Sequence, residues 1–236
     1  MYSLPAHREE YLGIQFDLLS KSQAVQRILR WVAATHTGPH AKAVGCINSR
    51  QMLQAYCDSE YCDQINELQM RLIDSSTFLH TARTTGSKLF ESVTGAGLFA
   101  SVLEANRDHR VVKQMHLLSR KNKQLETWQG AIGYLYPEMD CTTCLLDAPQ
   151  TGTEREEYWL ELTLLHTDLL LVILPRSELI QWLAYYQRAM IHTKVCMLLA
   201  ESDSVEIENC VLLKKHQFAP NSRKNWSSLL WQQLIH

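Results

Sequence analysis

Three polar residues stand at the ends of apolar runs in this 236-residue chain, and their side chains can do acid–base and hydrogen-bonding chemistry. They are Asn48, Asp74 and Asp203. If the apolar runs are parallel strands of one sheet, their carboxyl ends meet at one edge, where open α/β sheets bind ligands. Asn and Asp are also among the residues that most often cap helices. The pattern therefore fits a shared pocket as well as separate helix caps, and for Asn48 and Asp74 taken alone capping is the commoner role.

A further candidate is the glycine-containing segment 94–97, which reads Thr-Gly-Ala-Gly. Glycines such as Gly95 let the backbone approach a ligand closely, and the N–H groups at a helix start can bind a phosphate. The chain has neither the G-x-G-x-x-G nor the G-x-x-x-x-G-K-[ST] pattern. By itself, then, the segment does not identify a nucleotide fold.

Cysteine and histidine give little support to a metal centre. Seven cysteines are an odd number for a disulfide framework, so we expect reduced thiols. Cys141 and Cys144 have the C-x-x-C spacing of zinc and redox sites, but the two Thr between them favour a strand and no matching second pair is evident. His36 and His40 stand four apart, yet Gly and Pro between them break the helix that would align them. We expect no metal, and keep zinc or redox chemistry at 141–144 as a minor alternative.

Composition and charge exclude several classes of protein. The chain is 46% hydrophobic with a formal net charge of −2, so disorder and a whole-chain nucleic-acid-binding field are both excluded. The longest apolar runs, such as 169–174, are far shorter than the roughly 20 residues of a membrane-spanning helix. Residues 1–10 lack the pattern of a secretory signal. We therefore predict a cytoplasmic protein that does not bind nucleic acid.

The elements that must position these residues alternate between strand-like and helix-like periodicity, which predicts an α/β fold. We expect a Rossmann-like, mostly parallel sheet with helices on both faces and two packed lobes in one domain, with a seam near 148–153. The predicted strands are 12–16, 43–47, 70–73, 111–118, 141–146, 168–174 (central) and 195–200. Seven helices are predicted between these strands. The first begins after Ser20 or Ser22 and ends at 38–39, the second follows Asn48, and the last follows 175–178. The others cover 61–68, 92–105, about 122–136 and 156–166.

Two segments carry more specific expectations. In the predicted helix 156–166, the residues expected to face the core are Trp159, Leu160 and Leu164. We divide the chain into a domain over 1–220 and a C-terminal amphipathic helix over 221–236. Basic and aromatic residues concentrate near this end, a composition typical both of a membrane-surface contact and of a helix docked on the domain. Both interpretations stay open.

Several short motifs follow one another in an order that spans most of the chain. They are Leu12-Gly13-Ile14, Cys46-Ile47-Asn48, Leu72-Ile73-Asp74-Ser75, Ser92-Val93-Thr94-Gly95-Ala96-Gly97-Leu98, Thr167-Asp168-Leu169-Leu170-Leu171-Val172, Pro175-Arg176-Ser177-Glu178, Asp203 and Ala219-Pro220. Together they resemble the WecB/TagA/CpsF glycosyltransferases, bacterial enzymes that add an N-acetylmannosamine-type sugar to a polyprenyl-diphosphate-linked acceptor.

The resemblance implies a fold, an activity and a set of site residues. It implies that an N-acetylhexosamine-type sugar is transferred, with inversion, from a UDP-sugar donor to a polyprenyl-diphosphate-linked acceptor. The product would serve the synthesis of a bacterial surface polysaccharide or exopolysaccharide. The reaction would need no cofactor and would take place at the inner face of the cytoplasmic membrane. Asp74 would be the general base and Asn48 would orient a reacting oxygen. The implied substrate-binding residues are Thr94, Gly95, Arg176 beside the diphosphate, Glu178, and Asp203 on the uracil.

The chain departs from the family pattern at three positions. Ser75, Ser92 and Ser177 stand where the family has Gly, Arg and Gln. Losing a glycine and a cation bears directly on how a diphosphate is held. The alternative function is therefore a non-catalytic homologue that acts as partner or regulator of a polysaccharide glycosyltransferase. The residues also leave open whether the chain forms a homo-oligomer.

Overall fold

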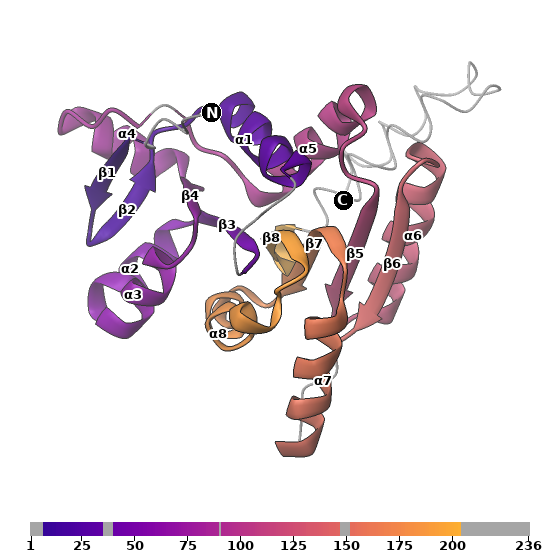
Figure 1. Cartoon of the computed structure of the whole chain (residues 1–236). Helices are drawn as coiled ribbons and strands as arrows, with labels where there is room; N and C mark the ends of the chain where they lie inside the picture. The colour runs from indigo at the N-terminus through magenta and orange to yellow at the C-terminus, as the bar shows by residue number, and fades with distance from the viewer. Residues whose placement is uncertain (1–6, 35–39, 90, 147–151, 204–236) are drawn as a thin grey trace, which may run out of the picture.

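A computed structural model describes residues 7–34, 40–89, 91–146 and 152–203 of the chain, and Figure 1 shows their arrangement. Within these ranges six strands form one sheet in the order β4-β3-β8-β7-β5-β6, and every neighbouring pair is parallel. The strands are β3 (Lys42–Ile47), β4 (Met70–Ile73), β5 (Gln114–Ser119), β6 (Asp140–Leu145), β7 (Thr167–Leu174) and β8 (Thr193–Ala200). A separate antiparallel hairpin joins β1 (Arg8–Tyr11) to β2 (Ile14–Asp17).

Helices cover both faces of the sheet, which confirms the predicted Rossmann-like α/β class. One face carries α1 (Lys21–Ala33), α5 (Gly95–His109) and α6 (Asn122–Leu135). The other carries the hairpin with α2 (Ser49–Cys57), α3 (Ser59–Asn66), α4 (Ser76–Thr84), α7 (Gly152–Leu164) and α8 (Arg176–Tyr186). Two short 3-10 helices, η1 (Gln187–Ala189) and η2 (Glu201–Asp203), follow α8 and β8. None of the described helices has the length and apolar character to cross a bilayer.

The central strands β7 and β8 are buried on both faces, as predicted for the apolar run 168–174. They pair from Thr167 with Thr193 to Leu174 with Ala200. Alternate side chains of both strands enter the two core layers, which explains why the sequence here is apolar at nearly every position. The predicted seam near 148–153 does not divide the sheet, because β6 and β7, on its two sides, both pair with β5.

Polar residues just before the helices set several of the observed boundaries. Ser20 begins α1 with a capping box, in which its Oγ accepts from the Gln23 backbone N–H and the Gln23 side chain accepts from the Ser20 backbone. The Asn106 side chain binds backbone groups of residues 111 and 112, and β5 begins only at Gln114, later than predicted. α1 ends at Ala33, before the predicted end, and residues 35–39 lie outside the described ranges.

The predicted inward face of the helix over 156–166 is wrong. Leu160 and Leu164 are 56% and 65% exposed and Trp159 is also exposed, whereas Leu162 is buried in the core. α7 also begins at Gly152, so the end of the predicted loop is helical. Apolar residues occur around the whole helix, and packing on the sheet selects a stripe that periodicity alone does not identify. The hairpin strand β1 and the helix α4 were not predicted.

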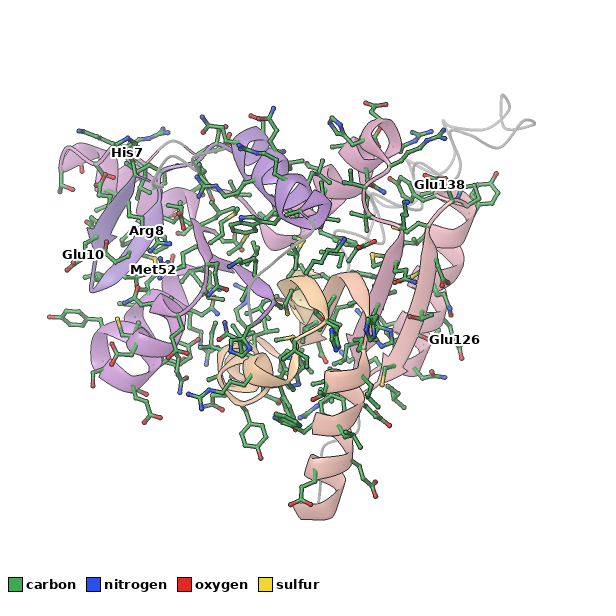
Figure 2. All side chains as sticks on the ribbon, in the orientation of Figure 1. His7, Arg8, Glu10, Met52, Glu126 and Glu138 are labelled. Atoms are coloured by element: carbon green, nitrogen blue, oxygen red, sulfur yellow. The ribbon has the colours of Figure 1, made fainter. Side chains whose placement is uncertain are left out.

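A buried carboxylate holds the hairpin against the edge strand β4. Asp17 at the end of β2 has no exposed side-chain surface, and it forms ion pairs with Arg8 at 3.5 Å and Arg27 at 3.4 Å. Its second oxygen accepts a hydrogen bond of 2.9 Å from the Arg71 backbone N–H. This contact satisfies a backbone donor of β4, the strand at one edge of the sheet. Figure 2 labels Arg8 on the hairpin side of the molecule.

We expect Asp17→Asn to destabilise the protein substantially, because it leaves two arginines without their shared counter-ion. The predicted loss is about 2–3 kcal/mol of unfolding free energy, below the cost of breaking a fully buried pair because both arginines are partly exposed. Urea unfolding measures it. Glu104→Gln is the control, since it breaks the exposed Glu104–Arg107 pair, worth at most about 1 kcal/mol. Equal losses in the two variants would contradict this role of Asp17.

Candidate functional site

The carboxyl ends of the parallel strands bring the predicted site residues to one edge of the sheet. Asp74 follows β4, and its backbone N–H donates 2.8 Å to the carbonyl of Ile47, the last residue of β3. The carbonyl of Ile73 accepts at 2.8 Å from the Val93 N–H. That contact holds Thr94, the N-cap of α5, next to the end of β4. These two contacts place the backbones of Asn48, Asp74 and the 94–97 segment at one edge of the sheet, while the roles of their side chains stay predictions.

A small pocket, open to solvent, lies beside these strand ends. Its walls come from β3, β8 and the beginnings of α2, α5 and α8. Two of the predicted substrate-binding residues, Gly95 and Arg176, line it, as does Gln51. Asn48 lies between the lining residues Ile47 and Gln51, whereas Asp74 and Glu178 are not among the residues that line it.

Two helices meet the pocket with their N-terminal ends from opposite faces of the sheet. α5 begins at Gly95 over one core layer, and α8 begins at Arg176 over the other. Helix N-termini carry partial positive charge and orphan N–H donors, so both favour an anion between them. Thr94 caps α5 by accepting 3.0 Å from the Gly97 N–H. A Cβ at position 97 would lie 2.8 Å from that Thr94 oxygen, so glycine suits the cap.

Asn48 and Asp74 differ in how their side chains are used. Asn48 caps α2 by accepting 2.9 Å from the Gln51 N–H, and the Gln51 side chain accepts 3.2 Å in return from the Asn48 N–H. The capping interpretation of Asn48 is therefore confirmed. For Asp74 it is wrong, because the cap of α4 is Ser75, whose Oγ accepts 3.2 Å from the Phe78 N–H. Asp74 itself is half-buried and directly precedes this cap.

The remaining candidates follow β7 and β8, and the two whose side chains are described contact different parts of the sheet edge. Arg176 donates 3.3 Å to the Ser202 hydroxyl on the β8 side. Glu178, in the first turn of α8, instead forms an ion pair of 2.8 Å with Arg120, which follows β5. Asp203 ends η2, and its side chain lies outside the described part of the structure.

Three charged or amide residues belong to this edge and were not predicted as site residues. Gln51 is buried in the pocket wall, and the N-cap spacing of Asn48 to Gln51 would have identified it. Arg120 and Lys121 follow the last residue of β5, so the rule that selected Asp74, a polar residue after a strand, applies to them equally. Lys121 forms an ion pair of 2.7 Å with Glu201, the residue after β8.

The C-x-x-C pair does not form a joint site in this structure. Cys141 and Cys144 lie on β6, where residues three apart face opposite sides of a strand. Cys141 packs against the α1, α5 and α6 layer, while Cys144 lies close enough to Tyr158 of α7 to influence its pKa. Over the described ranges, no group of three His, Cys, Asp or Glu side chains could hold a metal ion.

Thiol labelling at pH 8 should separate the cysteines by exposure and pKa. Burial raises the pKa of Cys141 to about 12, so roughly one part in ten thousand is thiolate at that pH. Among the cysteines that the structure describes, the exposed Cys57 should react first with iodoacetamide, the half-buried Cys141 slowly, and the fully buried Cys196 only after unfolding. Mass spectrometry of the labelled peptides reads this out. Labelling of Cys141 as fast as Cys57, or a Cys141–Cys144 disulfide on mild oxidation, would contradict the assignment.

Comparison with protein families identifies the family to which the chain is similar. The model of the "Glycosyl transferase WecG/TagA/CpsF family" matches residues 9–203 of the chain. The matched range contains the whole six-stranded sheet and every helix start that lines the pocket. No curated protein sequence matches the chain significantly. The segment 204–236, with the predicted C-terminal helix 221–236 and its membrane-contact residues, lies outside the described residues.

Proposed function

Because the chain belongs to the WecG/TagA/CpsF family of glycosyltransferases, we propose that it transfers an N-acetylhexosamine-type sugar from a UDP-sugar to a polyprenyl-diphosphate-linked acceptor, with inversion. The reaction would serve bacterial surface or exopolysaccharide synthesis at the inner face of the cytoplasmic membrane. The observation that carries this proposal is the pocket at the carboxyl edge of the sheet, where α5 and α8 begin and Arg176 lies in the wall.

The donor diphosphate would lie between the two helix starts. Its negative charge is favoured there by the two N-terminal dipoles and by the Arg176 guanidinium. Gly95, the first residue of α5, has no side chain to keep the ligand from the backbone N–H groups. The uracil would be bound through Asp203, a role that the family resemblance implies.

Asp74 would act as the general base. Its carboxylate would take the proton from the acceptor hydroxyl as that oxygen attacks the anomeric carbon of the donor sugar. The bond from that carbon to the UDP oxygen breaks on the opposite side, so the configuration inverts. Asn48 stands on the neighbouring strand end, where an amide N–H₂ remains to orient an oxygen while its carbonyl oxygen caps α2.

Departure of UDP would be the step that the pocket itself assists. Negative charge accumulates on the diphosphate as the glycosidic bond breaks, and groups already fixed around that charge stabilise the transition state without rearrangement. Arg176 is held by its contact with Ser202, and the helix starts are fixed by the core layers beneath them.

Asp74→Asn tests the proposed base. We expect transferase activity to fall at least about hundredfold, the typical contribution of a positioned base, while calorimetry still detects UDP binding because the donor contacts lie elsewhere. Asp108→Asn is the matched control, an exposed carboxylate at the far end of α5. Full activity in Asp74→Asn would remove Asp74 from the mechanism.

One observation favours the non-catalytic function, so this alternative is tested together with the enzymatic function. The Ser49 and Ser75 hydroxyls are 2.6 Å apart and bridge the ends of β3 and β4, at a position where the family pattern has a glycine in place of Ser75. If wild-type protein binds no UDP and shows no turnover, and Ser75→Gly restores neither, the partner or regulator function is favoured. UDP binding with turnover in the wild type excludes it.

A further inference from the structure

Two ion pairs cross the carboxyl edge of the sheet next to the pocket. Arg120 pairs with Glu178 at 2.8 Å, and Lys121 pairs with Glu201 at 2.7 Å. Both cations follow the end of β5, while the carboxylates belong to the first turn of α8 and to the residue after β8. In the sheet order, β7 lies between β5 and β8. The Lys121–Glu201 pair therefore spans the carboxyl end of β7 and connects the ends of β5 and β8.

The bridged position is a switch point of the fold. The helix that follows β5 is α6, which packs on one face of the sheet, and the helix that follows β7 is α8, which packs on the other. Neighbouring parallel strands whose connections leave toward opposite faces open a crevice at their carboxyl ends, and ligands of open α/β sheets bind in such crevices. The two ion pairs thus occupy the ligand end of the sheet.

The charges at this crevice are arranged to receive an anion. Arg120, Lys121 and Arg176 carry three positive charges, and Glu178 and Glu201 carry two negative ones. Asp203, the last residue of η2, follows Ser202 and is a third acidic residue at this end of the sheet. A guanidinium and an ammonium are both strong donors to phosphate oxygens, and the guanidinium binds them in a bidentate way. The glutamates satisfy two of these cations and would repel an incoming diphosphate.

We propose that Arg120 and Lys121 bind the diphosphate of the donor, and that Glu178 and Glu201 are internal counter-ions that the diphosphate displaces. The inference rests on the proposed function and deepens it, since it assigns Glu178 to competition with the donor in place of contact with it. The exchange costs little at the first pair, because the Arg120 and Glu178 side chains are 36% and 37% exposed. It costs more at the second pair, where Lys121 is 60% exposed but Glu201 only 17%.

The cation half of the proposal is tested by titrating the full chain with inorganic pyrophosphate and, separately, with UDP. Arg120→Gln and Lys121→Gln should each weaken both ligands about tenfold or more, the loss expected for a charge-assisted hydrogen bond. Lys123→Gln is the matched control, an exposed cation in the first turn of α6, and should bind both ligands as wild type does. Thermal unfolding confirms that each variant is folded.

The counter-ion half predicts the opposite sign for the glutamates. Glu178→Gln should tighten pyrophosphate and UDP by about two- to fivefold, the value of an exposed ion pair that no longer has to be broken. Glu201→Gln, at the less exposed carboxylate, should change both affinities in the same direction. Both should leave uridine binding unchanged, because uridine has no phosphate. Glu126→Gln on α6, labelled in Figure 2, removes a nearby exposed carboxylate that accepts from Asn122 and should change none of these affinities.

Each outcome separates this inference from the proposed function. If the wild type binds UDP but the Arg120 and Lys121 variants bind it equally well, the inference fails while the donor site stands. Weaker binding in the glutamate variants overturns the counter-ion exchange. If pyrophosphate binds and depends on Arg120 and Lys121 but uridine and UDP-sugars add nothing, the cation site stands and the donor assignment fails. No pyrophosphate binding to the wild type overturns the inference outright.

Discussion

The register between β7 and β8 is the constraint on which the rest of the structure depends. Both strands are buried on both faces, and their seven paired positions end together at Leu174 and Ala200. Side chains alternate between the two core layers, so a shift of one residue would exchange the layers along a whole strand. The same register makes Arg176 and Ser202 leave the sheet side by side. Core packing therefore fixes one wall of the candidate site.

The pocket acquires its anion-binding character from connectivity more than from unusual side chains. Right-handed connections between parallel strands start their helices at the carboxyl edge, and here α5 and α8 start on opposite faces around one space. The side chains at this edge then divide between two tasks. Asn48, Thr94 and Ser75 cap helices, whereas Arg176, Arg120 and Lys121 supply charge. Capping and ligand binding are thus compatible uses of one sheet edge.

The sequence predicts those features that depend on local physical chemistry. Apolar runs predict the six sheet strands, and the Asn48 to Gln51 spacing matches a helix start that forms as expected. The face of α7 is not predicted because Leu162 and its exposed neighbours are equally apolar, and only the sheet beneath selects between them. The partners of Arg120 and Lys121 lie 58 and 80 positions along the chain, and no local pattern encodes such a pairing. The sequence does not distinguish Asp74 from Ser75 as the cap of α4, because both side chains are suited to that role.

Hydrogen exchange of the full chain with and without saturating UDP tests the central claim most directly, because it locates the ligand without any substitution. The account predicts slower exchange in the five segments that border the pocket and crevice, residues 45–51, 94–98, 119–122, 175–180 and 198–202. Exchange in the β1–β2 hairpin and in α3 should be unchanged. Protection confined to other segments, or no protection at UDP concentrations that calorimetry shows to be saturating, would contradict a donor site at this edge of the sheet.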